Sequence, residues 1–592
     1  MSSNLATPEA QRPASPGHAS LARPRRGRSG STVLANGEPM IWLTGGALAV
    51  ALAMIVGLLV LVLVRGLSTF WPQPLVELHT AVGQKLLGEE TRRETYRPGE
   101  QLLAERPAED AARIRAAIEA NHGNAARRLV RTGNYDLTAK HFQWIDEALI
   151  VDESAPKWAV TLERLSWGRF FGVPQALLVD GQAVASGSAE VWDSFHALHP
   201  AVRERWRSRV RLAKHELGAV NRRKNAARLA VLAAKLEHGA DSPQHAAALE
   251  EQTHLADREE AENARITAEI AALDAENARY QMRLTTVDGQ EKLIPLEQIV
   301  RAYAPNRMGW FGKLGVYLAR WWEFLSDEPR EANSEGGVFP AIWGTVAMTL
   351  IMSIAVVPFG VLAALYMREY ARKGPLVSIL RIAINNLAGV PSIVFGVFGL
   401  GFFCYAVGVQ VDQLFFTTQL AENTPTFGTG GILWASLTLA LLTLPVVIVT
   451  TEEALAAVPG SMREGSYACG ASKWQTIWRI VLPRALPGVM TGMILAIARG
   501  AGEVAPLMLV GAMKSAPELP IDGIFPFVHP PRSFMHLGFH LYDLGFHSQN
   551  SEAARPMVFT TALLLIAIIA VLNITAVRLR NRLRKRFGAN QA

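Results

Sequence analysis

Residues 464–483 read EGSYACGASKWQTIWRIVLP and lie between two long apolar segments. The stretch is largely polar, with a glycine at position 470 and a proline at position 483. Glycine permits a tight turn, and proline stops or restarts a helix. We therefore predict two short helices joined at Gly470 and held at a membrane surface, where they can contact another protein.

Six apolar runs approach the roughly 20 residues that a helix needs to cross a bilayer. They are Ile41–Val64, Ala341–Tyr366, Ile379–Val407, Ile432–Val449, Gly488–Ala512 and Met557–Val577. Half of the chain is hydrophobic. The first run is longer than the 7–15 residues typical of a signal-peptide core, so we expect a retained span. The sequence predicts an all-α polytopic membrane protein with six transmembrane helices.

Lys and Arg residues gather in four places beside these runs. They are Arg23, Arg25, Arg26 and Arg28; Arg368, Arg372, Lys373 and Arg381; Arg463, Lys473, Arg479 and Arg484; and Arg578 to Arg586. With six spans all four clusters fall on one side, which the positive-inside rule makes cytoplasmic. Both termini and the 464–483 loop are then cytoplasmic. This bias explains the net charge of +7 without nucleic-acid binding, and the basic tail at 578–592 is suited to contact membrane lipid.

The region between the first two spans, residues 65–340, must then be extracytoplasmic, whereas residues 1–38 have the composition of a disordered basic tail. Residues 201–284 predict two long helices with a turn at Gly239–Pro243 and coiled-coil-like spacing in the second. The first arm is basic and the second acidic. This hairpin either pairs only with itself or docks another protein.

Strand patterns flank the hairpin on both sides. Trp158–Leu162 and Ala176–Gly181 precede it, and an Asp-Gly turn with Lys292–Ile294 follows it. We therefore expect one inserted mixed α/β domain that the hairpin splits.

Several kinds of chemistry find no support in the sequence. No G-x-x-x-x-G-K-[ST] phosphate loop occurs, so ATP would have to be bound by another polypeptide. The two cysteines, Cys404 and Cys469, predict neither a disulfide nor a metal site, and no cofactor is expected. His536 and His540 have the spacing of metal ligands on a helix, but packing at the membrane interface is the favoured interpretation. A membrane enzyme would need an acid–base or metal constellation that we do not find.

Two charges, Arg499 and Glu503, fall near the middle of the fifth predicted span. A charge there is costly unless it faces a partner or a wet pathway. Four residues apart on a helix, the two side chains share a face and can pair. Either the pair only fixes helix packing, or it lines a translocation pathway, where a guanidinium would attract an oxyanion and Glu503 would prevent overly tight binding.

Motifs in the second half of the chain resemble a known family. The spacing of Glu464, Gly470, Ile480, Leu482 and Pro483 resembles the coupling loop of ABC-importer permeases, with Gly465-Ser466 where that motif has two alanines. Residues 499–507 (RGAGEVAPL), 385–392 (NNLAGVPS) and 451–455 (TEEAL) resemble signatures of phosphate-importer permeases of the PstA type. Together these motifs cover about residues 335–577.

The resemblance implies an ABC type I importer permease core at 341–577, with a cytoplasmic coupling loop at 451–486 that docks an ATPase. It also implies a PstC-type permease partner, a dimer of ATPase subunits, a periplasmic phosphate-binding protein and a location in the bacterial inner membrane. Asn385 and Asn386 would either face the pathway or bond between helices. The alternatives are another oxyanion as substrate, or a phosphate-status sensor or scaffold that uses the external hairpin.

Overall fold

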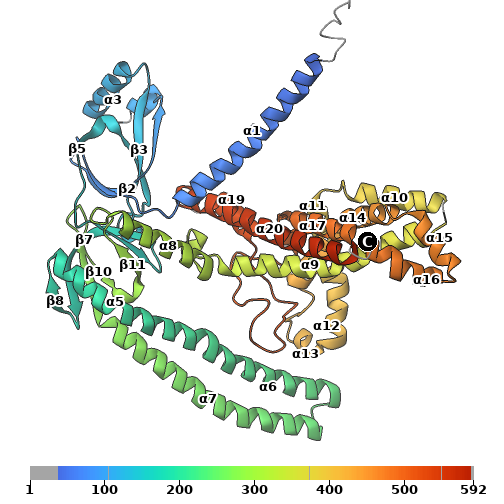
Figure 1. Cartoon of the computed structure of the whole chain (residues 1–592). Coiled ribbons are helices and arrows are strands. Elements are labelled where there is room, and N and C mark those ends of the chain that lie inside the picture. Colours follow the sequence, from blue (N-terminus) through green and yellow to red (C-terminus); the bar gives the residue numbers. More distant parts are fainter. Residues whose placement is uncertain (1–37, 105, 373, 549, 589–592) are drawn as a thin grey trace, which may run out of the picture. The chain divides into compact units, whose positions relative to one another are not determined.

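The computed structural model describes residues 38–588 except 105, 373 and 549, so the tail expected at residues 1–38 lies almost entirely outside the described residues. The chain divides into two compact units, residues 1–61 and 62–592. The described part of the first unit is the N-terminal portion of helix α1, Glu38–Ser68. The second unit holds two antiparallel sheets, a helical hairpin and the remaining long helices (Figure 1).

Within the described residues, six helical segments are long and apolar enough to cross a membrane, as expected. They are Met40–Ser68, Phe339–Tyr370, Ser392–Phe415, Ile432–Ala456, Lys473–Gly500 and Ser551–Arg582. The second comprises α9 (Phe339–Leu365) and a π-helical turn at Tyr366–Tyr370. The fourth is α14 (Ile432–Ala456), and the sixth lies in α20 (Ser551–Gly588), which continues through most of the predicted basic tail.

Two of the predicted spans have the wrong bounds. The run expected at Ile379–Val407 is divided between a short helix, α10 (Pro375–Leu387), and a span that starts at Ser392, after Pro391. This span comprises α11 (Ser392–Phe398), a π-helical segment (Gly399–Gly408) and α12 (Val409–Phe415). The run expected at Gly488–Ala512 ends earlier, because α17 (Leu482–Gly500) stops before a separate helix α18 (Ala505–Val510). Proline and glycine interrupt both apolar runs.

Residues 75–154 form a five-stranded antiparallel sheet that the sequence patterns did not reveal. Its order is β4-β3-β2-β1-β5. The strands are β1 (Leu75–Thr80), β2 (Lys85–Tyr96), β3 (Ala125–Arg131), β4 (Phe142–Asp146) and β5 (Ile150–Ser154). Helices α2 (Glu100–Ala104) and α3 (Ala108–Ala120) connect β2 to β3, and α3 buries Ile114 against Leu103, Ala125 and Leu149.

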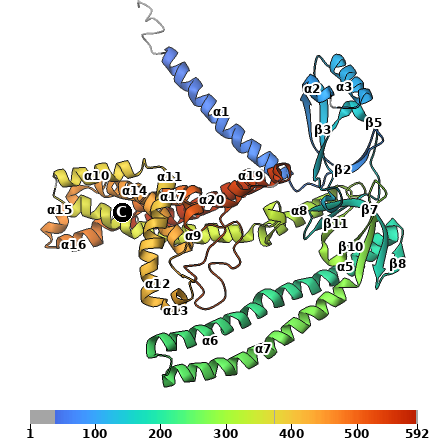
Figure 2. The same ribbon diagram turned by 180° about the vertical axis from the view of Figure 1, so that it is seen from behind.

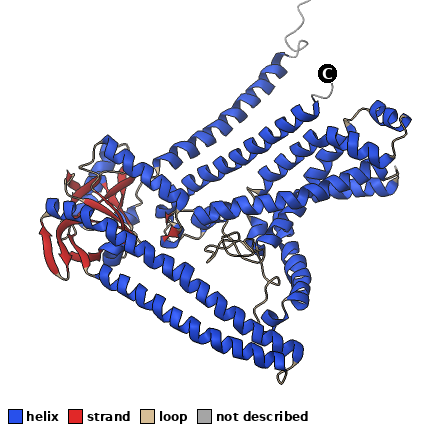
Figure 3. Cartoon of the chain, turned by 60° about the horizontal axis from the view of Figure 1, so that its bottom comes forward, coloured by secondary structure: helices blue, strands red, loops and turns tan. Residues whose placement is uncertain are grey.

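The second sheet confirms that one domain is split by the hairpin. Its order is β10-β9-β7-β6-β11, with β8 paired to β7. The strands before the hairpin are β6 (Val160–Arg164), β7 (Arg169–Val179) and β8 (Gln182–Ser186), and those after it are β9 (Tyr280–Thr285), β10 (Glu291–Pro295) and β11 (Ile299–Tyr303). Val191, Phe195 and Val202 of α5 (Ser188–Arg211) pack against its buried face. Figure 3 distinguishes the strands of both sheets from the helices.

The hairpin leaves this sheet through α5 and a π-helical turn (Leu212–Glu216) and consists of α6 (Leu217–His238) and α7 (Pro243–Ala278). The two helices lie side by side in Figures 1 and 2. An ion pair joins its arms, because Arg223 of α6 contacts Glu259 of α7 at 2.6 Å, and Arg209 of α5 contacts Asp274 of α7 at 3.2 Å. The expected end at Leu284 is wrong, because Tyr280–Thr285 pair into the sheet as β9. Coiled-coil packing along the hairpin stays a prediction.

The helices of the second half pack around α14, whose buried residues face α9 and α17. Glycines permit the closest approaches, as expected of membrane helices. A Cβ atom at Gly360 of α9 would lie 2.5 Å from Val447, and one at Gly492 of α17 would lie 2.1 Å from the Thr450 Oγ1. Gly399 likewise lies against Thr438. Further elements include α4 (Tyr135–Thr138), α8 (Trp310–Ser326), a small β12–β13 hairpin (Pro329–Arg330 and Glu335–Gly336), α13 (Thr417–Ala421), α15 (Gly460–Ala468), α16 (Lys473–Thr476), a π-helical turn (Ile477–Val481) and α19 (Leu537–Phe546).

Candidate functional site

Arg499 and Glu503 lie where α17 ends, and not in the middle of a continuous span. Arg499 belongs to the last turn of α17, and Glu503 lies in the short connection to α18. Gly500 and Gly502 weaken the helix at this point, and Pro506 lacks the N–H that a continuous helix would need, a loss that is tolerated in the first turn of α18. The expected position within one unbroken helix is therefore corrected, although the two residues still lie one turn apart.

The two charges nevertheless pair. Arg499 Nε lies 3.7 Å from Glu503 Oε1, and the side chains are 34% and 22% exposed. Among the described residues Arg499 makes no side-chain hydrogen bond, so its N–H donors remain available to a ligand. Gly500 brings this end of α17 close to α9, since a Cβ there would lie 2.4 Å from Met352 Sδ. The arrangement is a half-exposed cation beside a carboxylate at a break between two helices.

Asn385 and Asn386 lie on α10 and are exposed, not within the third span. Asn385 lines a cavity of about 300 Å³ between α10, α14 and the end of α9, together with Arg368, Arg381 and Glu453. Arg381 forms an ion pair with Glu452 across this cavity. Neither Asn386 nor Arg499 lines it. The structure thus brings Arg499 and Glu503 together and places Asn385 in a separate polar cavity.

The 464–483 loop folds as the sequence predicted. Helix α15 ends at Ala468, Gly470 adopts a left-handed conformation with φ of +81°, and α16 begins at Lys473. Ser472 caps α16: its hydroxyl accepts from the Gln475 backbone, and the Gln475 side chain accepts from the Ser472 backbone. This reciprocal capping fixes where the second helix starts.

The proposed contact residues of this loop differ in exposure. Glu464 and Gly470 are exposed, whereas Ile480, Leu482 and Pro483 are half-buried. Beside the last three, Ile477 and Val481 pack into a core with Leu365, Leu455 and Val458 from the ends of α9 and α14. The apolar end of the loop is therefore part of the helix bundle, and its polar beginning is accessible to a partner.

Arg463 anchors the loop, a role that sequence reasoning missed. Its guanidinium donates to the carbonyl oxygens of Val458 (2.7 Å) and Leu455 (2.9 Å) and to Glu369 Oε1 (2.9 Å). The side chains of Arg463 and Glu369 are 17% and 9% exposed. These contacts join α15 to the last residues of α14 and to the π-helical turn after α9. The sequence had suggested only a contribution to the positive-inside bias.

An exposed aromatic surface accompanies the polar beginning of the loop. Trp474 and Trp478 are each 59% exposed and stack with ring centroids 5.5 Å apart. Tyr467 on α15 is 41% exposed. Aromatic side chains are enriched in protein interfaces, so this surface is suited to bind a protein partner.

The interpretation of His536 and His540 as surface packing at the membrane interface is wrong. Both are buried, at 0% and 2% exposure, beneath the N-terminal part of α9, where Thr345 Oγ1 accepts from the Leu537 backbone at 2.9 Å. Burial lowers the pKa of His536 to about 3 and that of His540 to about 4, so both imidazoles are neutral near pH 7. No group of three or more potential metal ligands occurs among the described residues.

Comparisons with known proteins identify a family for the second half of the chain. Residues 356–587 match the model of the family described as "Binding-protein-dependent transport system inner membrane component". The phosphate transport system permease protein PstA 1 of Mycobacterium tuberculosis is 33% identical over 289 residues, 49% of this chain and 83% of that protein. PstA of Mycobacterium leprae is 39% identical over 196 residues, 33% of this chain and 58% of that protein, so the match spans less than two thirds of that relative.

Solved structures with local similarity include the MetNI methionine ABC transporter, at 19% identity and a TM-score of 0.29 over 41% of this chain and 94% of that one. A bacterial alginate ABC transporter matches at 15% identity and a TM-score of 0.31, over 45% of this chain and 83% of that one.

Six candidate spans, a capped loop at 464–483 and the match to residues 356–587 define the class: an inner-membrane component of a binding-protein-dependent transport system. Within that class, the identity and coverage of the mycobacterial relatives specify the family. The chain belongs to the PstA-type phosphate transport system permeases. The matched region of the family model leaves residues 1–355 outside it, including both sheets and the hairpin.

Proposed function

We propose that this chain is the membrane-spanning permease subunit of an ATP-driven importer of inorganic phosphate. The observation that carries the proposal is its membership of the PstA-type family, supported by the half-exposed Arg499 at the break between α17 and α18. Guanidinium donors match phosphate oxygens in charge and geometry. Glu503 beside it limits the affinity for an anion, and weak binding favours release during transport.

The energy source in this proposal is a separate dimer of ATPase subunits. The exposed Glu464 and the aromatic surface of Tyr467, Trp474 and Trp478 are the proposed docking face. Arg463 and the apolar residues Ile477 and Val481 then transmit movement of the docked loop to α9 and α14. Alternating access follows if ATP-dependent closure of the partner shifts these helix ends.

The remaining partners follow from the same proposal. A PstC-type subunit completes the permease, a periplasmic binding protein delivers phosphate, and membrane lipid surrounds the six helices in the bacterial inner membrane. Both termini and the 464–483 loop are cytoplasmic, because the basic clusters gather on that side. Residues 65–340 are then extracytoplasmic. Asn385 and Asn386 are proposed pathway residues, with Asn385 at the polar cavity beside Arg381.

Two alternatives have distinguishable consequences. Transport of another oxyanion would appear as uptake of sulfate or molybdate in preference to phosphate. A sensor or scaffold role has support from the hairpin, because α6 contacts loops of the permease half: Arg228 pairs with Glu422 at 2.8 Å and Arg222 with Glu518 at 3.4 Å. Those contacts offer a connection between the hairpin and the helix bundle.

The test is labelled-phosphate uptake into vesicles that contain the assembled transporter, with wild type, Arg499→Gln and Glu503→Gln. We expect Arg499→Gln to lower uptake at least tenfold, because one or two charge-assisted hydrogen bonds are each worth about 1.5–3 kcal/mol. Arg265→Gln, on the exposed hairpin, is the matched control and should transport normally. Normal uptake by Arg499→Gln at unchanged abundance would remove this residue from the pathway.

A further inference from the structure

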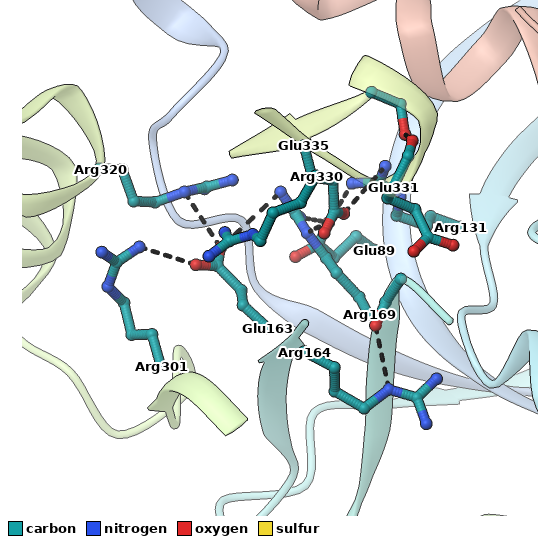
Figure 4. Close-up of polar contacts among 12 residues, drawn as sticks. Glu89, Arg131, Glu163, Arg164, Arg169, Arg301, Arg320, Arg330, Glu331 and Glu335 are labelled. Carbon is teal, nitrogen blue, oxygen red and sulfur yellow. Dashed lines mark hydrogen bonds and ion pairs between the residues drawn. The ribbon is translucent and has the colours of Figure 1, made fainter. Parts of the chain in front are cut away.

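A cluster of buried charges lies where the two sheets meet α8 and the β12–β13 hairpin (Figure 4). Most of its arginines are tightly paired. Arg169 contacts Glu89 at 2.7 Å, Arg301 contacts Glu163 at 2.7 Å, and Arg320 contacts Glu163 at 3.1 Å. A close partner of opposite charge offsets part of the cost of burying an ion. Glu89 Oε1, Glu163 Oε1 and Arg169 Nε nevertheless have no hydrogen-bond partner among the described residues.

Arg131, at the end of β3, is the exception. Its nearest carboxylate oxygens, on Glu89 and Glu335, are both 4.0 Å away, and its side chain is only 15% exposed. Its other contact is with the Phe142 ring, 5.3 Å from the guanidinium carbon to the ring centroid. Within the described residues the Arg131 guanidinium takes part in no hydrogen bond. Burial and the neighbouring Arg169 lower the pKa of Arg131 to about 10, which still leaves it a cation at neutral pH.

The guanidinium of Arg131 lines a cavity of about 200 Å³. A single water needs only about 10–15 Å³ by the same kind of measure, so the cavity has room for a small polyatomic ion. Arg169, His141 and Ser334 contribute to its wall, together with Ser548 and Asn550, which immediately precede α20. These side chains offer cationic, hydroxyl and amide groups to one partly open volume.

The backbone around the cavity adopts unusual conformations. Gly133 and Gly168 have φ of +57° and +66°, and the non-glycine residues Trp167 and Glu331 have φ of +69° and +47°. Such conformations cost free energy in non-glycine residues and concentrate at ligand sites. Gly133, Gly168 and Glu331 themselves line the cavity, which is independent support for a site that binds something.

Two carboxylates, Glu331 and Glu335, share this wall with the arginines. A fully ionised anion such as sulfate only accepts hydrogen bonds and is repelled by a carboxylate. A protonated oxyanion accepts from arginine and also donates its own O–H to a carboxylate. Burial and the nearby Glu335 raise the pKa of Glu331, consistent with a carboxyl group able to share a proton.

We propose that this cavity is a second oxyanion site, separate from the translocation pathway, which takes a protonated oxyanion of the phosphate type through Arg131 and Arg169. The bound ion supplies the hydrogen-bond acceptors that Arg131 lacks, and Glu331 or Glu335 accepts from its O–H. The site belongs to the sheets and to Glu331, Ser334, Glu335, Ser548, Asn550 and Ala553, and it contains neither Arg499 nor Asn385.

The site has a route to the membrane helices. Asn550 Oδ1 accepts from the Ala553 backbone at 3.2 Å in the first turn of α20, and Glu552 of the same turn pairs with Arg92 of β2 at 3.0 Å. Thr560 of α20 in turn donates to the carbonyl oxygen of Gly66 at 3.2 Å. An ion held between Arg131 and the start of α20 therefore adds a contact between the first sheet and the last span. Occupancy stiffens that junction.

The experiment is equilibrium binding of labelled inorganic phosphate to the purified full-length permease in lipid nanodiscs, without ATP and without a binding protein. Wild type, Arg131→Gln, Arg131→Lys, Arg499→Gln and the exposed control Arg265→Gln are compared, with sulfate as competitor. We expect saturable binding that Arg131→Gln weakens tenfold to a hundredfold, the equivalent of one charge-assisted hydrogen bond of about 1.5–3 kcal/mol. Arg265→Gln should bind as wild type does, and Arg499→Gln should lose only a weak pathway component while keeping the saturable component that depends on Arg131.

Each outcome bears on the proposal. Unchanged binding in folded Arg131→Gln, or loss of all binding in Arg499→Gln, overturns it, because the ion then sits elsewhere. Equal displacement by sulfate overturns the assignment to a protonated oxyanion. Arg131→Lys keeps the charge but not the planar donor fork, so it should fold and still bind less tightly; wild-type affinity in that variant also contradicts the geometry. If Arg131→Gln loses phosphate binding but still transports, or if Arg499→Gln loses transport but still binds phosphate at the second site, then the second site and the proposed import function are separate.

Discussion

Arg463→Gln should disconnect the 464–483 loop from the helix bundle. The wild-type side chain is 17% exposed and makes three hydrogen bonds: to the Leu455 carbonyl in the last turn of α14, to the Val458 carbonyl just after it, and to Glu369, which is 9% exposed. Breaking a buried charge pair by removing one partner typically costs about 3–5 kcal/mol, because the remaining charge is left uncompensated. We expect a loss in the lower part of that range, about 3 kcal/mol, since glutamine can retain one carbonyl contact.

This loss falls on the connection between the loop and the helices. Uptake should therefore fall much more than ATP hydrolysis by the assembled transporter. The assay measures phosphate uptake and ATP hydrolysis on the same vesicles, which gives phosphate transported per ATP hydrolysed. Arg479→Gln is the matched control, because Arg479 is an exposed arginine of the same loop. A transport-to-hydrolysis ratio in Arg463→Gln equal to that of wild type would refute the anchoring role.

Three further changes test other parts of the structure. Gly344→Ala should destabilise the helix bundle by about 1–3 kcal/mol, because the new Cβ would lie 2.1 Å from the Met535 carbonyl oxygen. Gly401→Ala, which has open space around it, should leave stability unchanged, and thermal unfolding of the two variants tests the difference. The folded-state pKa of His540 lies below its ordinary value, so the stability that neutral His540 contributes is present above pH 6.5 and is lost as the pH falls. In His540→Leu the free energy of unfolding should therefore fall less on acidification, by about 1.4 kcal/mol per pH unit between pH 6.5 and 5. An unchanged pH dependence of the unfolding free energy would contradict the burial. Deletion of residues 222–258 removes the outer part of the hairpin, with its internal Arg223–Glu259 pair, and two partly exposed ion pairs from it to Glu422 and Glu518, each worth less than about 1 kcal/mol. Phosphate uptake should therefore persist, and its loss in an assembled complex would favour the sensor or scaffold alternative.

The long apolar runs and the loop motif were predictable because single, strong signals specify them. A run such as Ile432–Val449 leaves few alternatives to a span, and Gly470 with Ser472 and Gln475 specifies a turn and a helix start within six residues. The split sheet was also predictable, since its Asp-Gly turns lie on both sides of the hairpin.

The sequence-based predictions failed at breaks between helices and at ion pairs between residues far apart in the sequence. Apolar composition alone does not distinguish one helix from two, so the breaks at Pro391 and at residues 501–504 were missed, and Asn385 and Glu503 were misplaced with them. The sheet at 75–154 carries many charges, which suggested no buried strand pattern. Several of its charged side chains pair with partners distant in sequence, such as Glu89 with Arg169. Arg463 was missed for the same reason, because Glu369 lies 94 positions away.

The central claim is import of phosphate, and its most direct test is transport by the purified complex. Vesicles would hold this chain with its permease, ATPase and binding-protein partners, and labelled phosphate uptake would be measured with and without ATP and with excess sulfate. The account predicts ATP-dependent accumulation of phosphate that sulfate does not displace. ATP-dependent uptake of sulfate in place of phosphate, or no accumulation by a fully assembled complex, would contradict it.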